Sequence, residues 1–223
     1  MSSERSICII ANGEKPASEV LKRALSGMGM VIAADGGSDH CRKMGVIPDV
    51  IIGDLDSTAK GIGKIFPDSE IIHLRDQETS DMEKAIEYAV TFKPVRINVI
   101  SAMGKRTDHM LANILLFDHL NRSERLKDVE IHIYDNLGVI RFLAPGRHII
   151  RNRRGRTVSF FSLGSISNLT LKGFRYNLEN AEYKENFMGL SNVYESEECI
   201  VEFAGESLIW YECYEAEGDE IDE

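Results

Sequence analysis

From the N-terminus to about Asn136, the chain alternates short apolar runs with longer amphipathic segments. The apolar runs are rich in Ile and Val, as is typical of strands buried on both faces of a parallel sheet. We expect strands at Ser6–Ala11, Met30–Ala34, Val50–Ile52, Glu70–His73, Arg96–Ser101 and Glu130–Tyr134. We expect helices between them at Pro16–Gly27, Ser38–Met44, Asp81–Phe92 and Thr107–Leu120. This rhythm predicts an α/β domain with a mostly parallel, doubly wound sheet.

The pattern changes after about Asn136, where short alternating runs are separated by glycines and no long helical segment is visible. We therefore divide the chain into an α/β domain, 1–138, and a second domain, 139–223. Strands of an antiparallel sheet pair are expected at Thr157–Phe161, Leu169–Leu171, Cys199–Phe203 and Ser207–Tyr211. We interpret the basic run from Arg147 to Arg156 as an exposed turn between strands, with a phosphate contact as the alternative. We interpret the acidic residues 215–223 as a solvated tail.

Charge and composition argue against several classes of partner. The formal net charge is −10, and no basic field is present that would bind duplex nucleic acid. We see neither a secretory signal nor an apolar stretch long enough for a membrane span. The four cysteines show no CxxC spacing and no zinc pattern. These features predict a cytoplasmic protein with reduced thiols and with neither nucleic-acid nor membrane partners.

Acidic residues follow two successive predicted strands. Asp35 precedes Gly36 and Gly37 directly after one strand, and Asp54 and Asp56 follow the next. Ligands bind at the carboxyl ends of strands in open α/β sheets, and carboxylate oxygens are ligands that Mg²⁺ prefers. These residues are therefore candidate catalytic groups and magnesium ligands. The alternative is that they cap helices and turns, as aspartates often do.

Two further clusters follow later strands. Ser80 and Asp81 stand at a predicted helix start, where Ser80 is either a plain N-cap completed by Glu83 or part of a site to which Asp81 adds a carboxylate. Lys105 and Arg106 stand at the next helix start, which favours anions, and Arg106 suits bidentate phosphate binding. Asp108 is a cap, a metal ligand or a substrate acceptor.

The chain has neither a GxxxxGK[ST] sequence nor a G-x-G-x-x-G after its first strand. If it uses ATP, the phosphate charge would have to be neutralised by Mg²⁺ on carboxylates, with help from Lys105 and Arg106.

The three clusters, in this order, resemble the thiamine pyrophosphokinase family. The motifs that carry the resemblance are Asp-Gly-Gly at 35–37, PDVIIGDLDS at 48–57, Ser80-Asp81, GKRTDHMLANI at 104–114, LKGFRYNL at 171–178 and GLSNVY at 189–194. The resemblance implies an α/β domain followed by an all-β sandwich, in a homodimer whose thiamine site lies between the subunits. It also implies Mg²⁺-dependent, in-line transfer of pyrophosphate from ATP to the thiamine hydroxyl, giving thiamine diphosphate and AMP.

The same resemblance implies roles for individual residues. It gives Asp54, Asp56 and Asp81 as magnesium ligands, with Asp35 supporting them, and it leaves Asp81 and Asp35 as alternatives for the general base. Arg106 and Asp108 would lie beside the ATP phosphates, and Lys105, which we add from its place at the helix start, would bind them as well. The implied substrate-binding residues are Gln77, Ser80, Ser191, Asn192 and Tyr194, and Tyr194 would stack on the thiamine ring.

The sequence departs from the family pattern at three places. Lys105 replaces the second glycine of the usual Gly-Gly-Arg, Ser80 replaces a threonine, and Phe174-Arg175-Tyr176 replaces the usual residues after the sandwich glycine. The last departure bears on the acceptor pocket. It leaves open a diphosphotransferase for another heterocyclic alcohol, such as a hydroxymethyl-pterin. A non-catalytic nucleotide- or thiamine-binding regulator is the other alternative, although no acidic residue of the pattern is missing.

Overall fold

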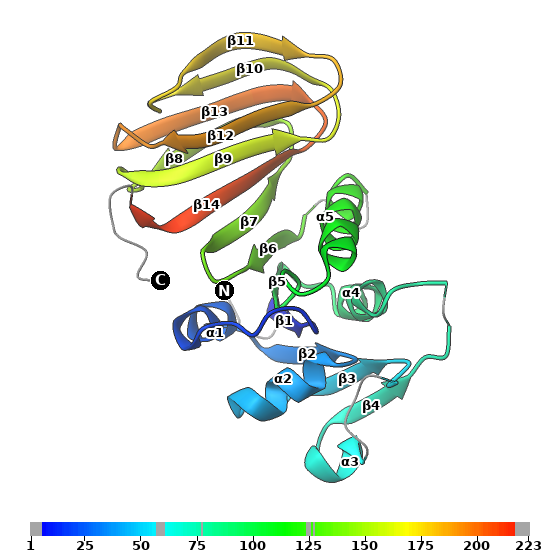
Figure 1. Cartoon of the computed structure of the whole chain (residues 1–223). Coiled ribbons are helices and arrows are strands. Elements are labelled where there is room, and N and C mark those ends of the chain that lie inside the picture. Colours follow the sequence, from blue (N-terminus) through cyan, green and yellow to red (C-terminus); the bar gives the residue numbers. More distant parts are fainter. Residues whose placement is uncertain (1–5, 57–60, 77, 124–125, 127, 217–223) are drawn as a thin grey trace. The chain divides into compact units, whose positions relative to one another are not determined.

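The fold is described from a computed structural model (Figure 1), which describes residues 6–56, 61–76, 78–123, 126 and 128–216. The chain divides into two compact units, Met1–Asn136 and Leu137–Glu223. Gln77 and most of the acidic C-terminal segment lie outside the described residues. Among the described residues, we find no helix of the length and apolarity needed to cross a membrane.

The first unit is built on a parallel sheet with strand order β6-β5-β1-β2-β3-β4. Its strands are β1 (Ser6–Ile10), β2 (Met30–Ala34), β3 (Val50–Gly53), β4 (Glu70–His73), β5 (Arg96–Ile100) and β6 (Glu130–Tyr134). All six predicted strands are present. The central strands are almost wholly buried, as expected for a parallel sheet, whereas the edge strand β4 is mostly exposed.

The strands of this sheet lie on both sides of β1, although all of them run parallel. From β1 the chain proceeds through β2, β3 and β4 to one edge, and then returns to place β5 and β6 on the other side of β1. The carboxyl ends of β1 and β5 therefore form a topological switch point, where ligands bind in open α/β sheets.

The helices of the first unit are α1 (Ser18–Leu25), α2 (Gly37–Met44), α3 (Ile62–Ile65), α4 (Asp81–Thr91) and α5 (Thr107–Asn121). The four predicted helices are present, and the short α3 was not predicted. Gly45 ends α2 in the left-handed conformation at φ 69°, which glycine adopts without strain. Ser80 is the N-cap of α4, since its Oγ accepts a hydrogen bond from the Glu83 backbone N–H at 3.2 Å.

The second unit consists, in its described part, of antiparallel strands. One group has the order β12-β9-β14-β7 and the other β11-β10-β13-β8. The strands are β7 (Gly138–Leu143), β8 (Gly146–Arg151), β9 (Arg156–Ser162), β10 (Ile166–Lys172), β11 (Leu178–Tyr183), β12 (Phe187–Val193), β13 (Glu198–Gly205) and β14 (Leu208–Ala216). Side chains from both groups share one core, which includes Phe160, Leu169, Val201 and Leu208. This is the packing of a β-sandwich.

The interpretation of 147–156 as a turn was wrong for its first half. Residues up to Arg151 belong to β8, and only the segment that follows, up to Gly155, is a turn. The reason is that this segment pairs with β13 and places Ile150 in the sandwich core, while its arginines take exposed positions, where Arg151 contacts Glu198 at 2.7 Å and Arg147 contacts Glu202 at 3.9 Å.

Candidate active site

Three carboxylates converge at the carboxyl ends of neighbouring strands in the first unit. Asp35 follows β2, Asp54 follows β3 and Asp81 begins α4, and one oxygen of each lies within 4.8 Å of the others. Parallel pairing of β2 with β3 brings the first two strand ends together. Asp35 is buried, whereas Asp54 and Asp81 are partly exposed. We call these three residues the carboxylate cluster.

Because Gly53 has no side chain, the carboxylates of the cluster can occupy the space beside it. A Cβ at this position would lie 2.9 Å from Asp35 Cβ and 3.1 Å from Asp81 Oδ1, and the backbone has a φ of +153°. Only glycine combines this conformation with so close an approach. The GDLDS motif therefore needs its glycine to bring two of the carboxylates together.

The structure groups Asp35, and not Asp56, with Asp54 and Asp81. The backbone N–H of Asp56 donates to Asp54 Oδ1 at 3.2 Å, across Leu55, which has a φ of 62°. The backbone of Asp56 thus helps to orient Asp54, and a ligand role for the Asp56 carboxylate remains a prediction.

Lys84 is a charged neighbour of the cluster that the sequence analysis did not identify. It is 6% exposed, and its Nζ donates to Asp81 Oδ1 at 3.3 Å. The available signal was its position three residues after Asp81, which places both on one face of α4.

The cluster opens into a cavity of about 450 Å³ at the switch point, which we call the crevice. Its walls come from the ends of β1, β2 and β5 and from the starts of α4 and α5. They include Asn12, Gly13, Asp35, Ser80, Asp81, Ser101, Lys105, Arg106 and His109. Acidic groups therefore stand on one side of the crevice and cationic groups with the α5 N-terminus on the other.

The cationic side contains Arg106 and Asp108, which form an exposed ion pair, with Nη2 and Oδ2 2.6 Å apart. The hydrogen bonds from Arg106 lower the pKa of the Asp108 carboxyl to about 2. Lys105 is exposed, and its Nζ donates to the backbone O of Asn12 at 2.8 Å and to Asn12 Oδ1 at 3.1 Å.

Backbone strain gathers around the crevice. Asp35, Leu55, Ser101 and Lys105 all have positive φ values, between 43° and 62°. Each of these residues follows the carboxyl end of β2, β3 or β5. Non-glycine residues in this region of φ are uncommon, and such strain is often found at ligand sites.

A second cavity, of about 710 Å³, lies along α4 beside the edge strand β4. Apolar and aromatic side chains form part of its walls, and charged side chains form the rest. The first kind includes Ile52, Ile72, Leu74 and Tyr88, and the second includes Arg75, Asp76, Glu83 and Glu87. Lys84 lines this cavity and also contacts the cluster through Asp81. The cluster is therefore adjacent to two spaces of different chemical character.

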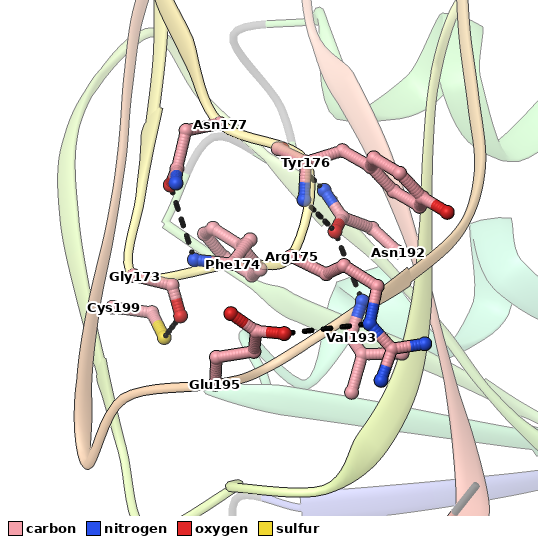
Figure 2. A network of polar contacts seen from close by, with 9 residues as sticks. All are labelled: Gly173, Phe174, Arg175, Tyr176, Asn177, Asn192, Val193, Glu195 and Cys199. Atoms are coloured by element: carbon pink, nitrogen blue, oxygen red, sulfur yellow. Dashed lines mark hydrogen bonds and ion pairs between the residues drawn. The ribbon is translucent and has the colours of Figure 1, made fainter.

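In the second unit, Asn192 holds the loop after β10 (Figure 2). Its Oδ1 accepts from the Tyr176 backbone N–H at 2.9 Å, and its Nδ2 donates to Tyr176 O at 2.7 Å. Tyr176 is 62% exposed, so a large ring is presented on a fixed backbone. Ser191 is exposed at a φ of 50°, and its backbone N–H donates to Ser159 Oγ at 3.0 Å.

Tyr194 is 1% exposed, in the core of the sandwich. Its ring packs against Phe174 with centroids 5.1 Å apart, and its hydroxyl donates to Glu212 Oε2 at 3.2 Å. Burial, followed by the charge of Glu212, raises the pKa of Tyr194. The ring therefore supports the strand on which Ser191 and Asn192 lie, and no face of it is open to a ligand here.

The donor set of the cluster fits a hard divalent cation. It offers oxygen atoms only, from three different elements, and it faces a crevice where phosphate oxygens would complete the coordination. Asp35, Asp54 and Asp81 are thus the residues that would hold Mg²⁺.

Comparisons with known proteins agree with one another. The family model described as "Thiamin pyrophosphokinase, catalytic domain" matches residues 21–128, and the one described as "Thiamin pyrophosphokinase, vitamin B1 binding domain" matches residues 147–210. The thiamine pyrophosphokinase of Bacillus subtilis is 28% identical over 182 residues, which cover 79% of this chain and 83% of that protein. Thiamine pyrophosphokinase 2 of Arabidopsis thaliana is 28% identical over 180 residues, which cover 73% of this chain and 64% of that protein.

Solved structures give the same answer. The crystal structure of the Bacillus subtilis thiamine pyrophosphokinase aligns with a TM-score of 0.81 at 25% identity, covering 93% of this chain and 98% of that one. The two family models lie one in each compact unit and describe the two domains of a single family. The chain therefore belongs to the thiamin pyrophosphokinase family.

Proposed function

We propose that this chain is a Mg²⁺-dependent thiamine pyrophosphokinase that transfers pyrophosphate from ATP to the hydroxyl of thiamine. Family membership supports the reaction. The observation that carries the assignment to this part of the chain is the carboxylate cluster, because two of its members, Asp35 and Asp81, line a crevice that Lys105 and Arg106 also line. That arrangement suits a metal-bound polyphosphate chain.

In the proposed reaction, the thiamine oxygen attacks the β-phosphorus of ATP. A new P–O bond forms, the bond between the β-phosphorus and the oxygen bridging to the α-phosphorus breaks, and AMP leaves with that oxygen. The hydroxyl proton passes to a carboxylate of the cluster and then to solvent. Mg²⁺, when held by Asp35, Asp54 and Asp81, would neutralise charge on the phosphate oxygens.

The other wall of the crevice has a different task in this proposal. Arg106 is exposed at the start of α5 and would exchange its contact with Asp108 for a phosphate oxygen. The backbone N–H groups of the first turn of α5 add their partial positive charge. Asp108 would then orient Arg106, and Lys105 contributes charge on the same side.

The acceptor side is also proposed. Lys84 lines the cavity along α4 and contacts Asp81, so we propose that the acceptor occupies this cavity, with Lys84 between it and the cluster. Gln77, Ser80 and Ser191 are proposed to bind the acceptor, as the resemblance implies. The exposed Tyr176 would add an aromatic contact, on a backbone that Asn192 holds. Aromatic side chains such as Tyr176 suit a cationic aromatic ligand.

Three broader statements complete the proposal. The chain acts as a homodimer, as the resemblance implies. It works in the cytoplasm, where reducing conditions agree with four cysteines that form no disulfide in the described part of the chain. The parallel sheet is doubly wound, with α1 and α2 on one face and α4 and α5 on the other, as right-handed crossovers require for the observed strand order.

The assay uses purified chain with ATP, Mg²⁺ and thiamine, and follows AMP together with thiamine diphosphate. We expect both products in equal amounts, and we expect Asp54→Asn to lower turnover by about a thousandfold, as loss of a group that stabilises transition-state charge does. Asp68→Asn, an exposed change outside the cluster, is the matched control and should leave turnover unchanged.

AMP formation that depends on a hydroxymethyl-pterin and not on thiamine would support the other diphosphotransferase. No turnover with any alcohol, together with tight nucleotide or thiamine binding, would support a regulator. Unchanged turnover in Asp54→Asn would refute the metal site.

A further inference from the structure

The Lys105 side chain crosses between two loops of the crevice. Lys105 lies in the turn between β5 and α5 at a φ of 56°, and two acceptors of its ammonium group belong to Asn12, in the loop after β1. The two residues are 93 positions apart in the chain. Charge-assisted hydrogen bonds of this kind are roughly twice as strong as neutral ones.

The two loops are also joined along their backbones. The N–H of Gly13 donates to Ser101 O, and the N–H of Glu14 donates to Met103 O at 2.7 Å. A Cβ on Gly13 would lie 2.3 Å from the backbone oxygens of Ser101 and Met103, so the loops are packed backbone to backbone. Lys105 continues this junction to the rim of the crevice.

Asn12 connects the junction to the acidic side of the crevice. A Cβ on Gly36 would lie 2.3 Å from Asn12 Nδ2, so the amide rests directly on the backbone next to Asp35. His40 closes the junction from α2, with Nε2 2.9 Å from Gly13 O and 3.4 Å from Lys105 Nζ. Burial, with the charge of Lys105 contributing, lowers the pKa of His40, so a second positive charge beside the ammonium group is disfavoured.

We propose that Lys105 is a positioning residue, which holds residues 12–14 in place as a preformed wall of the crevice and acts on the donor nucleotide through Asn12. The inference rests on the proposed function in one respect, namely that the crevice takes ATP. It refines the sequence-based role of Lys105 as a phosphate ligand, because Asn12 already occupies two of the three ammonium donors. A preformed wall lowers the entropic cost of binding.

The first test needs no substrate. Amide hydrogen exchange is measured on the ligand-free chain for Gly13 and Glu14, whose N–H groups form the backbone junction. Lys105→Met removes the donors and should speed exchange at both amides by about tenfold, as expected for losing a hydrogen bond to a charged group. Lys93→Met is the matched control, since Lys93 is also a lysine at positive φ, 51°, and lies outside the crevice.

Lys105→Gly separates the ammonium group from the backbone. Glycine relieves the positive φ and also removes the donors. Faster exchange in both Lys105 variants, with Lys93→Met unchanged, supports the proposal. The proposal would be overturned if exchange at the Gly13 and Glu14 amides were unchanged in Lys105→Met. It would also be overturned if exchange were faster in Lys105→Met but unchanged in Lys105→Gly.

The second test measures ADP affinity by calorimetry, with Mg²⁺ present and without acceptor. Lys105→Met and Asn12→Ala should each weaken ADP binding by about tenfold. The double variant should bind ADP as well as the poorer-binding single variant does, because the effects of coupled residues are not additive. Losses that multiply to about a hundredfold would show that Lys105 acts independently of Asn12, which refutes the inference. If the unaltered chain binds no nucleotide, the proposed function fails, and the role of Lys105 toward the nucleotide fails with it.

Discussion

Replacing Gly53 with alanine would insert one methyl group between two of the three carboxylates. The new Cβ would lie 2.9 Å from Asp35 Cβ, 3.1 Å from Asp81 Oδ1 and 3.3 Å from Asp35 Cα. Two of these neighbours are at or next to the backbone, so they yield only if β2 and β3 separate by several tenths of an ångström. The positive φ of 153° adds strain of about 1–3 kcal/mol for a residue with a Cβ.

The expected consequences differ for fold and for chemistry. We expect Gly53→Ala to lower the free energy of unfolding by about 2 kcal/mol, which urea titration will measure. Turnover should fall by about a hundredfold, because displacing catalytic groups by a fraction of an ångström to one ångström has effects of that order. Affinity for Mn²⁺, read by its electron paramagnetic resonance signal, should fall by at least about tenfold, as when the support of a metal ligand is lost.

Gly27→Ala is the control for strain without crowding. Gly27 also has a positive φ, 74°, but nothing lies within 4 Å of the position that a Cβ would take there. It should lose stability and keep its turnover and Mn²⁺ affinity. If Gly53→Ala matches Gly27→Ala in all three measurements, the close approach at Gly53 does not hold the carboxylates together, and the metal site has been assigned wrongly.

Two further predictions concern buried charge. Glu212 is buried and contacts Arg153 at 3.4 Å and Arg156 at 3.3 Å. Glu212→Gln should therefore lower the free energy of unfolding, measured by urea titration, by about 2 kcal/mol, a figure that allows for the partly exposed arginines. Glu198→Gln, a change at an exposed ion pair, is the control and should cost under about 1 kcal/mol. Burial lowers the pKa of His40 in the folded chain, so the unfolded chain binds a proton at His40 more readily. The contribution of neutral His40 to stability is therefore present above about pH 6.5, and it is lost as the pH falls toward the lowered pKa of the folded chain. His40→Gln should therefore lose less stability than the parent chain between about pH 7.5 and about pH 5.5, and the exposed His119→Gln should match the parent. An equal loss in all three chains would refute this origin.

The sequence was sufficient to predict that Asp35 and Asp54 meet, because of how parallel sheets are built, although Asp56 was predicted as a magnesium ligand and lies outside the observed cluster. Asp35 and Asp54 each follow a strand, and parallel neighbours end at the same edge of the sheet whatever the details of packing. Asp81 joins them because α4 begins at that edge. Contacts that depend on the direction of a side chain could not be predicted in this way. The hydrogen bonds from Lys84 to Asp81 and from Lys105 to Asn12 are two examples.

The sandwich is harder to read for a physical reason that Ser191 illustrates. Pairing of β12 with β9 shifts register between Gly189 and Asn192, and Ser191 lies in this irregular stretch at a φ of 50°. A shift of one residue exchanges the inward and outward faces of a strand. Asn192 and Tyr194 consequently become structural groups within the sandwich, while Ser191 faces outward.

The register shift also changes which residues are available to a ligand. Because Asn192 turns inward and bonds both backbone groups of Tyr176, the ring of Tyr176 is presented at 62% exposure on a fixed backbone, while Tyr194 is withdrawn into the core. A motif such as GLSNVY thus fixes a neighbouring loop at least as much as it supplies contacts of its own. The aromatic group for an acceptor is then expected from the loop at 174–176, where this chain departs from the family pattern, so acceptor specificity is best tested at Tyr176.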